Sequence, residues 1–266
     1  MNLSFCGCGF LGLYHLGVAK TLVQKGRPLF EKVDRFCGAS AGSLIAALLA
    51  TKGPDEEQSI DFCYNLAADV RKVRFKSLNP KVSLLDPLEE FLLQALPPDA
   101  HQLASGKLFV SVTRKKKNSI VSEFQSRDEL IKYLLASSYI PRITGKEPIY
   151  IHDRRFLDGG MTNNLPIPMD GRTVTVSPFA GRQDICPPDA SRKPMHMNLA
   201  KQRFRVNLKN MRRAYHAFLP PKKEKMDKYF NQGVRDAEAF LIREGYIEEK
   251  QEAPLPAEEQ GAAKGQ

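Results

Sequence analysis

The chain has 266 residues, of which 42% are hydrophobic and 26% charged, and it contains no Trp. This composition is typical of an ordinary globular protein, and the length is enough for one large domain with a sizeable core. The formal net charge is +10, and because the segment 248–266 has five acidic and two basic residues, residues 1–247 carry +13. Such a body attracts anionic surfaces, which leaves acidic lipid headgroups and nucleic acid as the candidate partners.

The five cysteines are an odd number without the spacing of a disulfide framework, so we expect reduced thiols in a cytoplasmic protein. Cys6 and Cys8 form a C-x-C pair, but no second Cys/His cluster completes a zinc site, and we expect no metal and no organic cofactor. No Lys or Arg precedes the apolar stretch in residues 1–19, which is unlike a secretory signal peptide. No run of about 18 uncharged apolar residues occurs, so we expect neither secretion nor a transmembrane helix.

The first part of the chain alternates between short strands and helices. Residues 2–6 are predicted to form a buried strand that leads into a glycine loop, and residues 13–25 a helix. Residues 33–37 are predicted to form a second short strand, and the apolar run 43–50 a buried helix. A longer amphipathic helix is expected over residues 56–74.

Proline pairs and a polar turn delimit the next elements. Asp86-Pro87 opens a helix as N-cap and first helical residue, and Pro97-Pro98 ends it. Residues 108–113 and 119–124 alternate as strands on either side of the polar segment 114–118. This pattern predicts a β-hairpin.

The remaining elements complete an alternating pattern of strands and helices. Ser126 and Glu129 form a capping box at the start of another helix. Strands are predicted over 148–151 and 173–177, on either side of a loop that contains Asp158.

The last part of the sequence is predicted to be helical and then disordered. Two helices are expected over about 198–217 and 223–244, whereas residues 250–266 have few large apolar groups and are expected to be disordered. Because helices and strands alternate along the chain, we expect an α/β sandwich with a central sheet.

A glycine loop is the first of three motifs that indicate chemistry. Gly7, Gly9 and Gly12 fit G-x-G-x-x-G between a strand and a helix, which is the pattern of a dinucleotide-binding loop, and Glu31 and Asp34 stand near the position of a ribose-binding carboxylate. Glycines there let backbone N–H groups point outward at the start of a helix. Either a pyrophosphate or the oxyanion of a tetrahedral intermediate is stabilised by such groups, and a simple tight turn is the alternative.

The second motif is G-x-S-x-G around Ser40, with Gly38 and Gly42 at its ends. It lies between a short apolar strand and an apolar helix, which is the setting of a nucleophile elbow. Small residues flank the serine because the turn is sharp, and the helix dipole favours negative charge at its oxygen. The alternative is that Ser40 only caps the following helix.

The third motif is Asp158-Gly159-Gly160, a carboxylate in a tight turn. Alone, Asp-Gly is a common turn dipeptide. Combined with the glycine loop and the elbow, it predicts Asp158 as the general base for Ser40.

A Ser-His-Asp triad is the rival arrangement. The order Ser40, Asp158, His196 matches the chain order of α/β-hydrolases. His196 follows a polar, loop-like stretch, and His15, close after the glycine loop, is expected to pack in the first helix. The sequence therefore favours the dyad and leaves the triad open.

Together, the three motifs resemble those of the patatin-like phospholipase family, and most closely those of its adiponutrin-like branch. The likeness runs from residue 2 to residue 245. The shared runs of sequence are 8–12, 38–42, 136–141, 158–160 and 176–179.

The resemblance implies a three-layer α/β/α sandwich with a central mixed, mostly parallel sheet and additional C-terminal helices. We expect a catalytic domain over residues 1–180. We also expect a helical extension over 181–247, packed on or beside that domain, and a disordered acidic tail over 248–266.

It also implies a catalytic dyad in which Ser40 attacks an ester carbonyl and Asp158 accepts its proton, with an acyl-enzyme that water hydrolyses. Leu11 stands where broader members of the family have Arg, so a cationic helper is absent here. Pocket residues are expected at Phe10, Ile140 and Pro141. Backbone amides of the oxyanion hole are expected at Gly7, Cys8, Gly9 and Gly12.

A basic stretch supplies a candidate surface for lipid. Residues 201–213 contain six Lys or Arg and no acid, on a predicted helix with a stripe of apolar residues at helical spacing. This pattern favours a membrane or lipid-droplet surface, although a packed helix with a solvated face is equally consistent with it. No aromatic platform or recognised module indicates nucleic-acid binding. The apolar stripe is Phe204, Leu208, Met211 and Tyr215. The cationic residues proposed for the surface are Lys201, Arg205, Lys209, Arg212 and Arg213.

The sequence thus predicts a cytoplasmic, peripheral lipid acyl hydrolase that acts on acylglycerols, retinyl esters or phospholipids, with transacylation as a companion activity. Two other functions stay open. One is a weakly active scaffold on lipid droplets, and the other is a dinucleotide-binding oxidoreductase. The acyl chain, the oligomeric state and any protein partner are not determined by these motifs.

Overall fold

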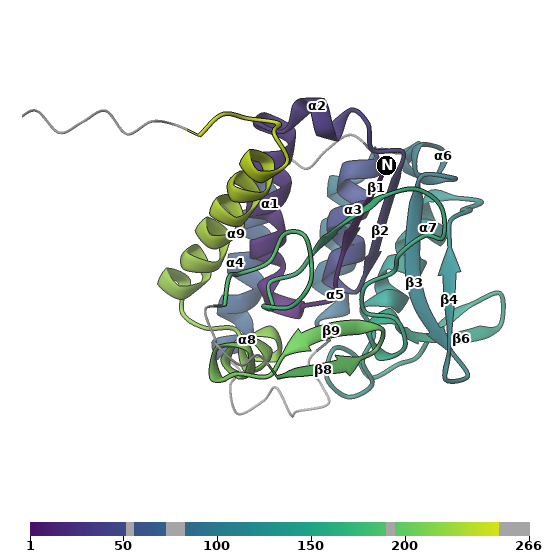
Figure 1. Ribbon diagram of the computed structural model, residues 1–266. Helices are drawn as coiled ribbons and strands as arrows, with labels where there is room; N and C mark the ends of the chain where they lie inside the picture. Colours follow the sequence, from purple (N-terminus) through teal and green to yellow (C-terminus); the bar gives the residue numbers. More distant parts are fainter. Residues whose placement is uncertain (52–55, 73–82, 190–194, 250–266) are drawn as a thin grey trace, which may run out of the picture.

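A mixed β-sheet forms the centre of the structure, a computed structural model that describes residues 1–51, 56–72, 83–189 and 195–249 (Figure 1). In these residues seven strands belong to the sheet, in the order β5-β6-β3-β2-β1-β7, with β4 paired to β3. Strands β7, β1, β2 and β3 run parallel, whereas β4, β5 and β6 pair antiparallel. The strands are β1 (Asn2–Phe5), β2 (Arg35–Ala39), β3 (Leu108–Arg114), β4 (Lys117–Val121), β5 (Ile149–Ile151), β6 (Arg154–Asp158) and β7 (Thr173–Val176).

Helices flank this sheet, so the architecture is the predicted three-layer α/β/α sandwich (Figure 1). Strand β1 is buried along its whole length, as expected for a central parallel strand that is covered on both faces. The core between sheet and helices is built largely from Leu, Ala, Phe and Val side chains. The helices are α1 (Gly12–Gln24), α2 (Arg27–Phe30), α3 (Ala41–Thr51), α4 (Glu56–Lys72), α5 (Leu85–Ala95), α6 (Ala100–Ala104), α7 (Arg127–Ser137), α8 (Leu208–Phe218) and α9 (Lys223–Arg243).

The C-terminal helix α9 packs along α1, the helix that follows the glycine loop (Figure 1). Two glycines bring the helix backbones together. A Cβ at Gly17 would lie 2.2 Å from the Phe230 carbonyl oxygen, and one at Gly233 would lie 2.1 Å from the Tyr14 carbonyl oxygen. Because only glycine fits at either position, α9 is held tightly on the rest of the fold. The division into a catalytic domain and an extension stays a prediction.

The helix predicted over 198–217 is wrong in its first half. Strands β8 (His196–Leu199) and β9 (Gln202–Arg205) form a separate two-stranded hairpin, and α8 begins only at Leu208. The hairpin turns at Ala200 and Lys201, both with positive φ, and Asn207 caps α8 by accepting a hydrogen bond from the Asn210 N–H at 2.7 Å. The cap and the turn divide a segment whose Lys and Arg content favours a helix throughout.

Smaller corrections have similar local causes. Asp86 is not the N-cap of α5, because the helix begins at Leu85 and the Ser83 hydroxyl accepts hydrogen bonds from the N–H groups of Leu85 (3.2 Å) and Asp86 (3.3 Å). Asp158 ends strand β6, which was not predicted, rather than lying in a loop. The capping role of Ser126 is confirmed by its 3.1 Å hydrogen bond from the Glu129 N–H.

The other predicted elements are confirmed with small shifts of their ends, and residues 73–74 of the helix predicted over 56–74 lie outside the described residues. The expected disorder of residues 250–266 concerns a segment outside the described residues. Within the described ranges, no helix has the length and apolar character needed to cross a membrane.

Candidate active site

Ser40 lies at the sharp turn between β2 and α3, where a strand passes directly into a helix. Its φ is +51°, in the left-handed region that non-glycine residues rarely adopt. The flanking glycines are required by space. A Cβ at Gly38 would lie 2.4 Å from the Gly42 carbonyl carbon, and one at Gly42 would lie 2.3 Å from the Phe5 carbonyl oxygen. The strand–turn–helix setting that the G-x-S-x-G pattern indicates is therefore present.

The glycine loop lies directly against this turn. A Cβ at Gly7 would approach Cβ of Ser40 to 3.2 Å, so the loop and the serine are neighbours. Gly9 has a φ of +52°, and a Cβ there would lie 2.1 Å from the Ala217 carbonyl oxygen on α8. The C-terminal helix α8 thus covers the loop from the outside.

The backbone N–H groups of the loop differ in what they bind. The Gly7 N–H donates to the Asn164 carbonyl oxygen at 3.1 Å, and the Gly12 N–H donates to the Gly9 carbonyl oxygen. Among the described residues, the N–H groups of Cys8 and Gly9 have no backbone acceptor. Of the four residues predicted for the oxyanion hole, these two therefore retain a free donor.

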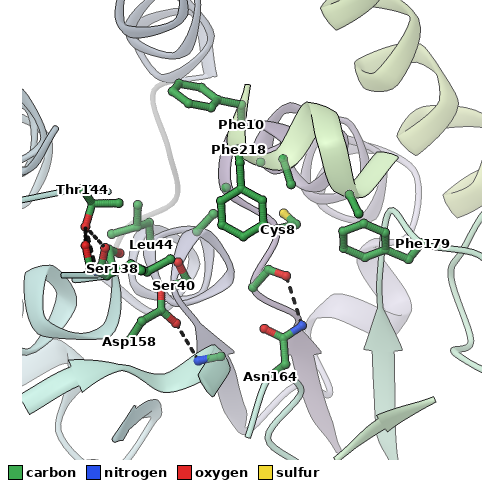
Figure 2. Close-up of a pocket in the computed structure, with 18 of the residues that line it drawn as sticks. Cys8, Phe10, Ser40, Leu44, Ser138, Thr144, Asp158, Asn164, Phe179 and Phe218 are labelled. Carbon is green, nitrogen blue, oxygen red and sulfur yellow. Dashed lines mark hydrogen bonds between the residues drawn. The ribbon is translucent and has the colours of Figure 1, made fainter. Parts of the chain in front are cut away.

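Asp158, the last residue of β6, faces Ser40 from the other side (Figure 2). Its side chain is 3% exposed, and its carboxylate accepts hydrogen bonds from the Ser40 hydroxyl and from the Gly160 N–H, the latter at 2.6 Å. Burial raises the pKa of Asp158 to about 6, and the two hydrogen bonds limit the rise. Gly159 is also confined, because a Cβ there would lie 2.0 Å from the Ser111 carbonyl oxygen.

The histidines make contacts elsewhere. His15 is buried, with Nε2 2.9 Å from the Cys6 carbonyl oxygen, and Nδ1 of His216 lies 2.8 Å from the Tyr229 hydroxyl. His196 lies on β8. The groups that shift the pKa of Asp158 are Ser40 and Gly160, with no histidine among them.

Ser40 and Asp158 open into a largely apolar pocket with a volume of about 630 Å³ (Figure 2). Such a volume is typical of a site for a small lipid-sized ligand. The predicted pocket residues Phe10 and Ile140 line it, whereas Pro141 lies outside the lining and is paired with Gly145. One wall comes from α3, α4 and α5, with Leu44, Leu48, Phe62, Leu66 and Phe91. The other wall comes from β8, β9 and α8, with Met197, Leu199, Phe204, Met211 and Phe218.

Asn164 joins the glycine loop to the β8–β9 wall. Its side chain is labelled in Figure 2. Its Nδ2 donates to the Gly7 carbonyl oxygen at 3.1 Å and to Oε1 of the buried Gln202 at 2.6 Å. Its own N–H donates to the Ala200 carbonyl oxygen at 2.8 Å. Sequence analysis missed this residue, because no local pattern marks an amide six residues after Asp158 as a neighbour of the loop.

The five cations predicted to face a lipid surface fall into two groups. Lys201, Lys209 and Arg212 are exposed. Arg205 is partly buried and pairs with Asp189 at 3.3 Å. Arg213 is also partly buried and donates to Oδ1 of Asn210 at 2.9 Å.

The two acidic residues that stand near the ribose-binding position of a dinucleotide-binding loop do not form such a site. Glu31 pairs with Arg27 at 2.8 Å, and Asp34 accepts a hydrogen bond from the N-terminal amine at 2.6 Å, so neither acid reaches the glycine loop. Within the described part of the chain, no group of three or more His, Cys, Asp or Glu side chains is arranged to hold a metal ion.

A strand–turn–helix serine at an apolar pocket in an α/β/α sandwich is typical of α/β hydrolases. Comparison with family profiles matches residues 3–169 to patatin-like phospholipase. The chain belongs to the patatin-like phospholipase family, as the motifs and their resemblance to the adiponutrin-like branch predicted. The family comprises lipid hydrolases and acyltransferases.

Three relatives illustrate the range of the likeness. The chain is 42% identical over 250 residues to human patatin-like phospholipase domain-containing protein 4, covering 93% of this chain and 99% of the relative. It is 38% identical over 248 residues to human patatin-like phospholipase domain-containing protein 2, covering 92% of this chain and 49% of that protein. It is 34% identical over 246 residues to mouse 1-acylglycerol-3-phosphate O-acyltransferase Pnpla3, covering 92% and 59%. The chain therefore spans nearly all of the first relative but only about half of the other two.

Proposed function

We propose that this protein cleaves lipid esters with Ser40 as the nucleophile and Asp158 as its general base. The observation that carries this proposal is that the Ser40 turn and the buried Asp158 carboxylate meet at the same apolar pocket, where Ser40 also lowers the pKa of Asp158. With a pKa of about 6, this carboxylate is ionised at neutral pH and accepts the proton as Oγ of Ser40 attacks the ester carbonyl. A dyad of this kind needs no histidine.

The reaction then proceeds through an acyl-serine. The N–H groups of Cys8 and Gly9 stabilise the oxyanion, since they have no other backbone acceptor among the described residues. When the tetrahedral intermediate collapses, the bond to the alcohol breaks and the alcohol leaves with the proton held by Asp158. Asp158 then deprotonates a water molecule, which attacks the acyl-serine. As the bond from the acyl carbon to Oγ breaks, Asp158 returns the proton to Ser40 and the fatty acid is released.

The pocket favours an uncharged ester over a phospholipid. Among the described lining residues, Arg205 is the one cationic side chain, and it is already paired with Asp189. A phosphate headgroup in this pocket would therefore leave its charge without a partner, which is costly in an apolar environment. Acylglycerols and retinyl esters fit the lining better.

The same region of the surface suits contact with lipid. Met197, Leu199, Met211 and Phe218 line the pocket and are each at least half exposed. Exposed Lys209 lies on α8 beside them. We propose that this face docks peripherally on an anionic membrane or lipid droplet, with apolar side chains entering the lipid and cations remaining at its surface.

Transacylation is the second candidate activity. The pocket continues along both walls from Ser40, so an acyl chain on one wall leaves the other for an acceptor alcohol. An alcohol in place of water would accept the acyl group from Ser40 by the same steps. The name of the mouse relative as an O-acyltransferase gives this candidate further weight.

Labelling with a fluorescent fluorophosphonate tests the nucleophile. Wild type should be labelled at Ser40, as located by peptide mapping, and Ser40→Ala should take up no label. Ser4→Ala is a matched control that should be labelled like wild type, because Ser4 is also buried but lies on β1, outside the pocket lining. A folded wild type that takes up no label would favour a lipid-binding scaffold instead, and binding of NAD(P) by calorimetry would revive the oxidoreductase.

A further inference from the structure

The backbone N–H of Ser40 is held by a side chain rather than by secondary structure. It donates a 2.9 Å hydrogen bond to Oγ of Ser137. With its left-handed φ, Ser40 has left the ladder of β2 and precedes the first residue of α3. Its N–H therefore depends on the Ser137 hydroxyl for an acceptor.

The same hydroxyl is bound at its other end to the strand beside Asp158. Oγ of Ser137 donates a 2.7 Å hydrogen bond to the Ser111 carbonyl oxygen on β3. The next residue of β3, Val112, pairs with Asp158 on β6. Ser137, the last residue of α7, is fully buried, so water does not replace either hydrogen bond.

The two ends of this link are the two groups of the proposed dyad. The Ser137 hydroxyl accepts a hydrogen bond from the turn that carries Ser40. It donates a hydrogen bond to β3, the strand that pairs with Asp158 on β6. A hydroxyl has one donor and two acceptor sites, which allows it to bind both partners at once. No apolar residue in this position could join them.

We propose that Ser137 is a positioning residue that sets the spacing between the Ser40 hydroxyl and the Asp158 carboxylate. This inference rests on the proposed function of the dyad. Without the Ser137 hydroxyl, the Ser40 N–H loses its acceptor, and the turn relaxes toward another partner. The proton transfer from Ser40 to Asp158 then starts from a longer and poorly aligned contact.

The test compares Ser137→Ala with a matched control, Ser4→Ala. Ser4 lies on β1, outside the pocket lining, and is also fully buried. Its hydroxyl donates a single hydrogen bond to the Pro166 carbonyl oxygen at 2.6 Å. Measurements are the rate constant of fluorophosphonate labelling, kcat and KM on a soluble short-chain ester, and Tm. We expect Ser137→Ala to lower kcat and the labelling rate by roughly 10- to 100-fold with KM within about twofold, the size of effect that a shift of about 1 Å produces. Ser4→Ala should lose stability but keep both rates.

A pH profile separates positioning from simple packing. The hydrogen bond from Ser40 lowers the pKa of Asp158, so a weaker bond lets that pKa rise. The acid limb of the kcat/KM profile of Ser137→Ala should therefore lie at higher pH than that of wild type. Ser137→Cys, with a group of similar size and weaker hydrogen bonds, should give an intermediate rate, and it also serves if the alanine variant does not fold.

Two results would overturn the inference. One is a Ser137→Ala or Ser137→Cys protein that labels at the wild-type rate with an unmoved pH profile. The other is a loss of activity that follows the loss of Tm equally in the Ser137 and Ser4 variants. Failure of the proposed function is distinct, because wild type itself would then take up no label at Ser40.

Discussion

The hydroxyl of Tyr14 on α1 donates a 2.7 Å hydrogen bond to the carboxylate of Asp236 on α9, across 222 positions of sequence. Both residues are buried, and Gln232 donates to the other carboxylate oxygen at 2.6 Å. This contact ties the last helix to the helix that begins at the glycine loop. We therefore expect residues 223–243 to unfold together with the part of the chain that carries the site.

Tyr14→Phe should consequently destabilise the whole protein. The change keeps the ring and removes one hydrogen bond to a buried carboxylate, which costs about 1–3 kcal/mol. Urea denaturation should show a single transition with a lower midpoint. Tyr215→Phe, at an exposed position on α8, is the control and should have the same urea midpoint as wild type. If Tyr14→Phe left stability unchanged, α9 would be an appendage rather than a part of the core.

The raised pKa of Asp158 predicts the pH dependence of activity. The ionised carboxylate is the base, so kcat/KM on a soluble ester should fall as pH drops through about 6. Asp158→Asn should lose at least about 10³-fold in kcat, within roughly tenfold of Ser40→Ala, because members of a catalytic unit act together. An active Asp158→Asn protein together with an inactive His196→Ala protein would instead establish the triad.

The same pKa predicts that Asp158 lowers stability at neutral pH. Its folded pKa of about 6 lies above the unfolded value of 3.8, so the folded protein binds the proton more tightly. The destabilisation is absent below pH 3.8, develops as pH rises through 6, and reaches up to about 3 kcal/mol above it. Asp158→Asn should therefore unfold at a higher temperature than wild type at pH 8, and the difference should shrink toward pH 4. An Asp158→Asn protein that is less stable than wild type at pH 8 would contradict the destabilisation that the raised pKa of Asp158 predicts.

Local patterns predicted most of the fold and both residues of the proposed dyad. Motifs such as G-x-S-x-G specify a backbone shape. A Cβ at Gly42 would lie 2.3 Å from the Phe5 carbonyl oxygen, so only glycine fits there. Short apolar runs and alternating apolar residues similarly predicted the strands of the sheet other than β6. These signals are short in sequence, so a single chain reveals them.

Contacts between distant segments could not be predicted in this way. Ser137 and Asn164 lie far from Ser40 in the sequence, and nothing in their neighbours indicates which backbone groups they bind. The β8–β9 hairpin was missed because Gln202, a good helix former, is buried against Asn164 and Ser177 instead. Tertiary hydrogen bonds decided the structure at these positions.

Gly9→Ala should impair catalysis as well as stability. The new Cβ would meet the Ala217 carbonyl oxygen at 2.1 Å, which forces either α8 or the loop with the Cys8 and Gly9 N–H groups to move. Gly106→Ala is a matched control, because Gly106 also has positive φ (+76°) but has no atom within 4 Å of the Cβ position. Gly106→Ala should lose about 1 kcal/mol of stability from backbone strain, and Gly9→Ala should lose more because of the contact with the Ala217 carbonyl oxygen. Only Gly9→Ala should lose kcat on a soluble ester, by at least tenfold, and equal activities would exclude a role of the loop in oxyanion binding.

Charge reversal on α8 should separate lipid docking from chemistry. Lys209→Glu with Arg212→Glu changes two exposed cations on the helix whose side chains Met211 and Phe218 line the pocket mouth. Binding to vesicles that contain anionic lipid should weaken by roughly tenfold or more, since each cation near such a surface contributes about 1 kcal/mol. Hydrolysis of a soluble short-chain ester should stay within about twofold of wild type. Lys115→Glu with Lys116→Glu makes the same charge change at the β3–β4 turn and should leave vesicle binding nearly intact. Equal weakening by both pairs would mean that overall charge, rather than the α8 face, governs docking.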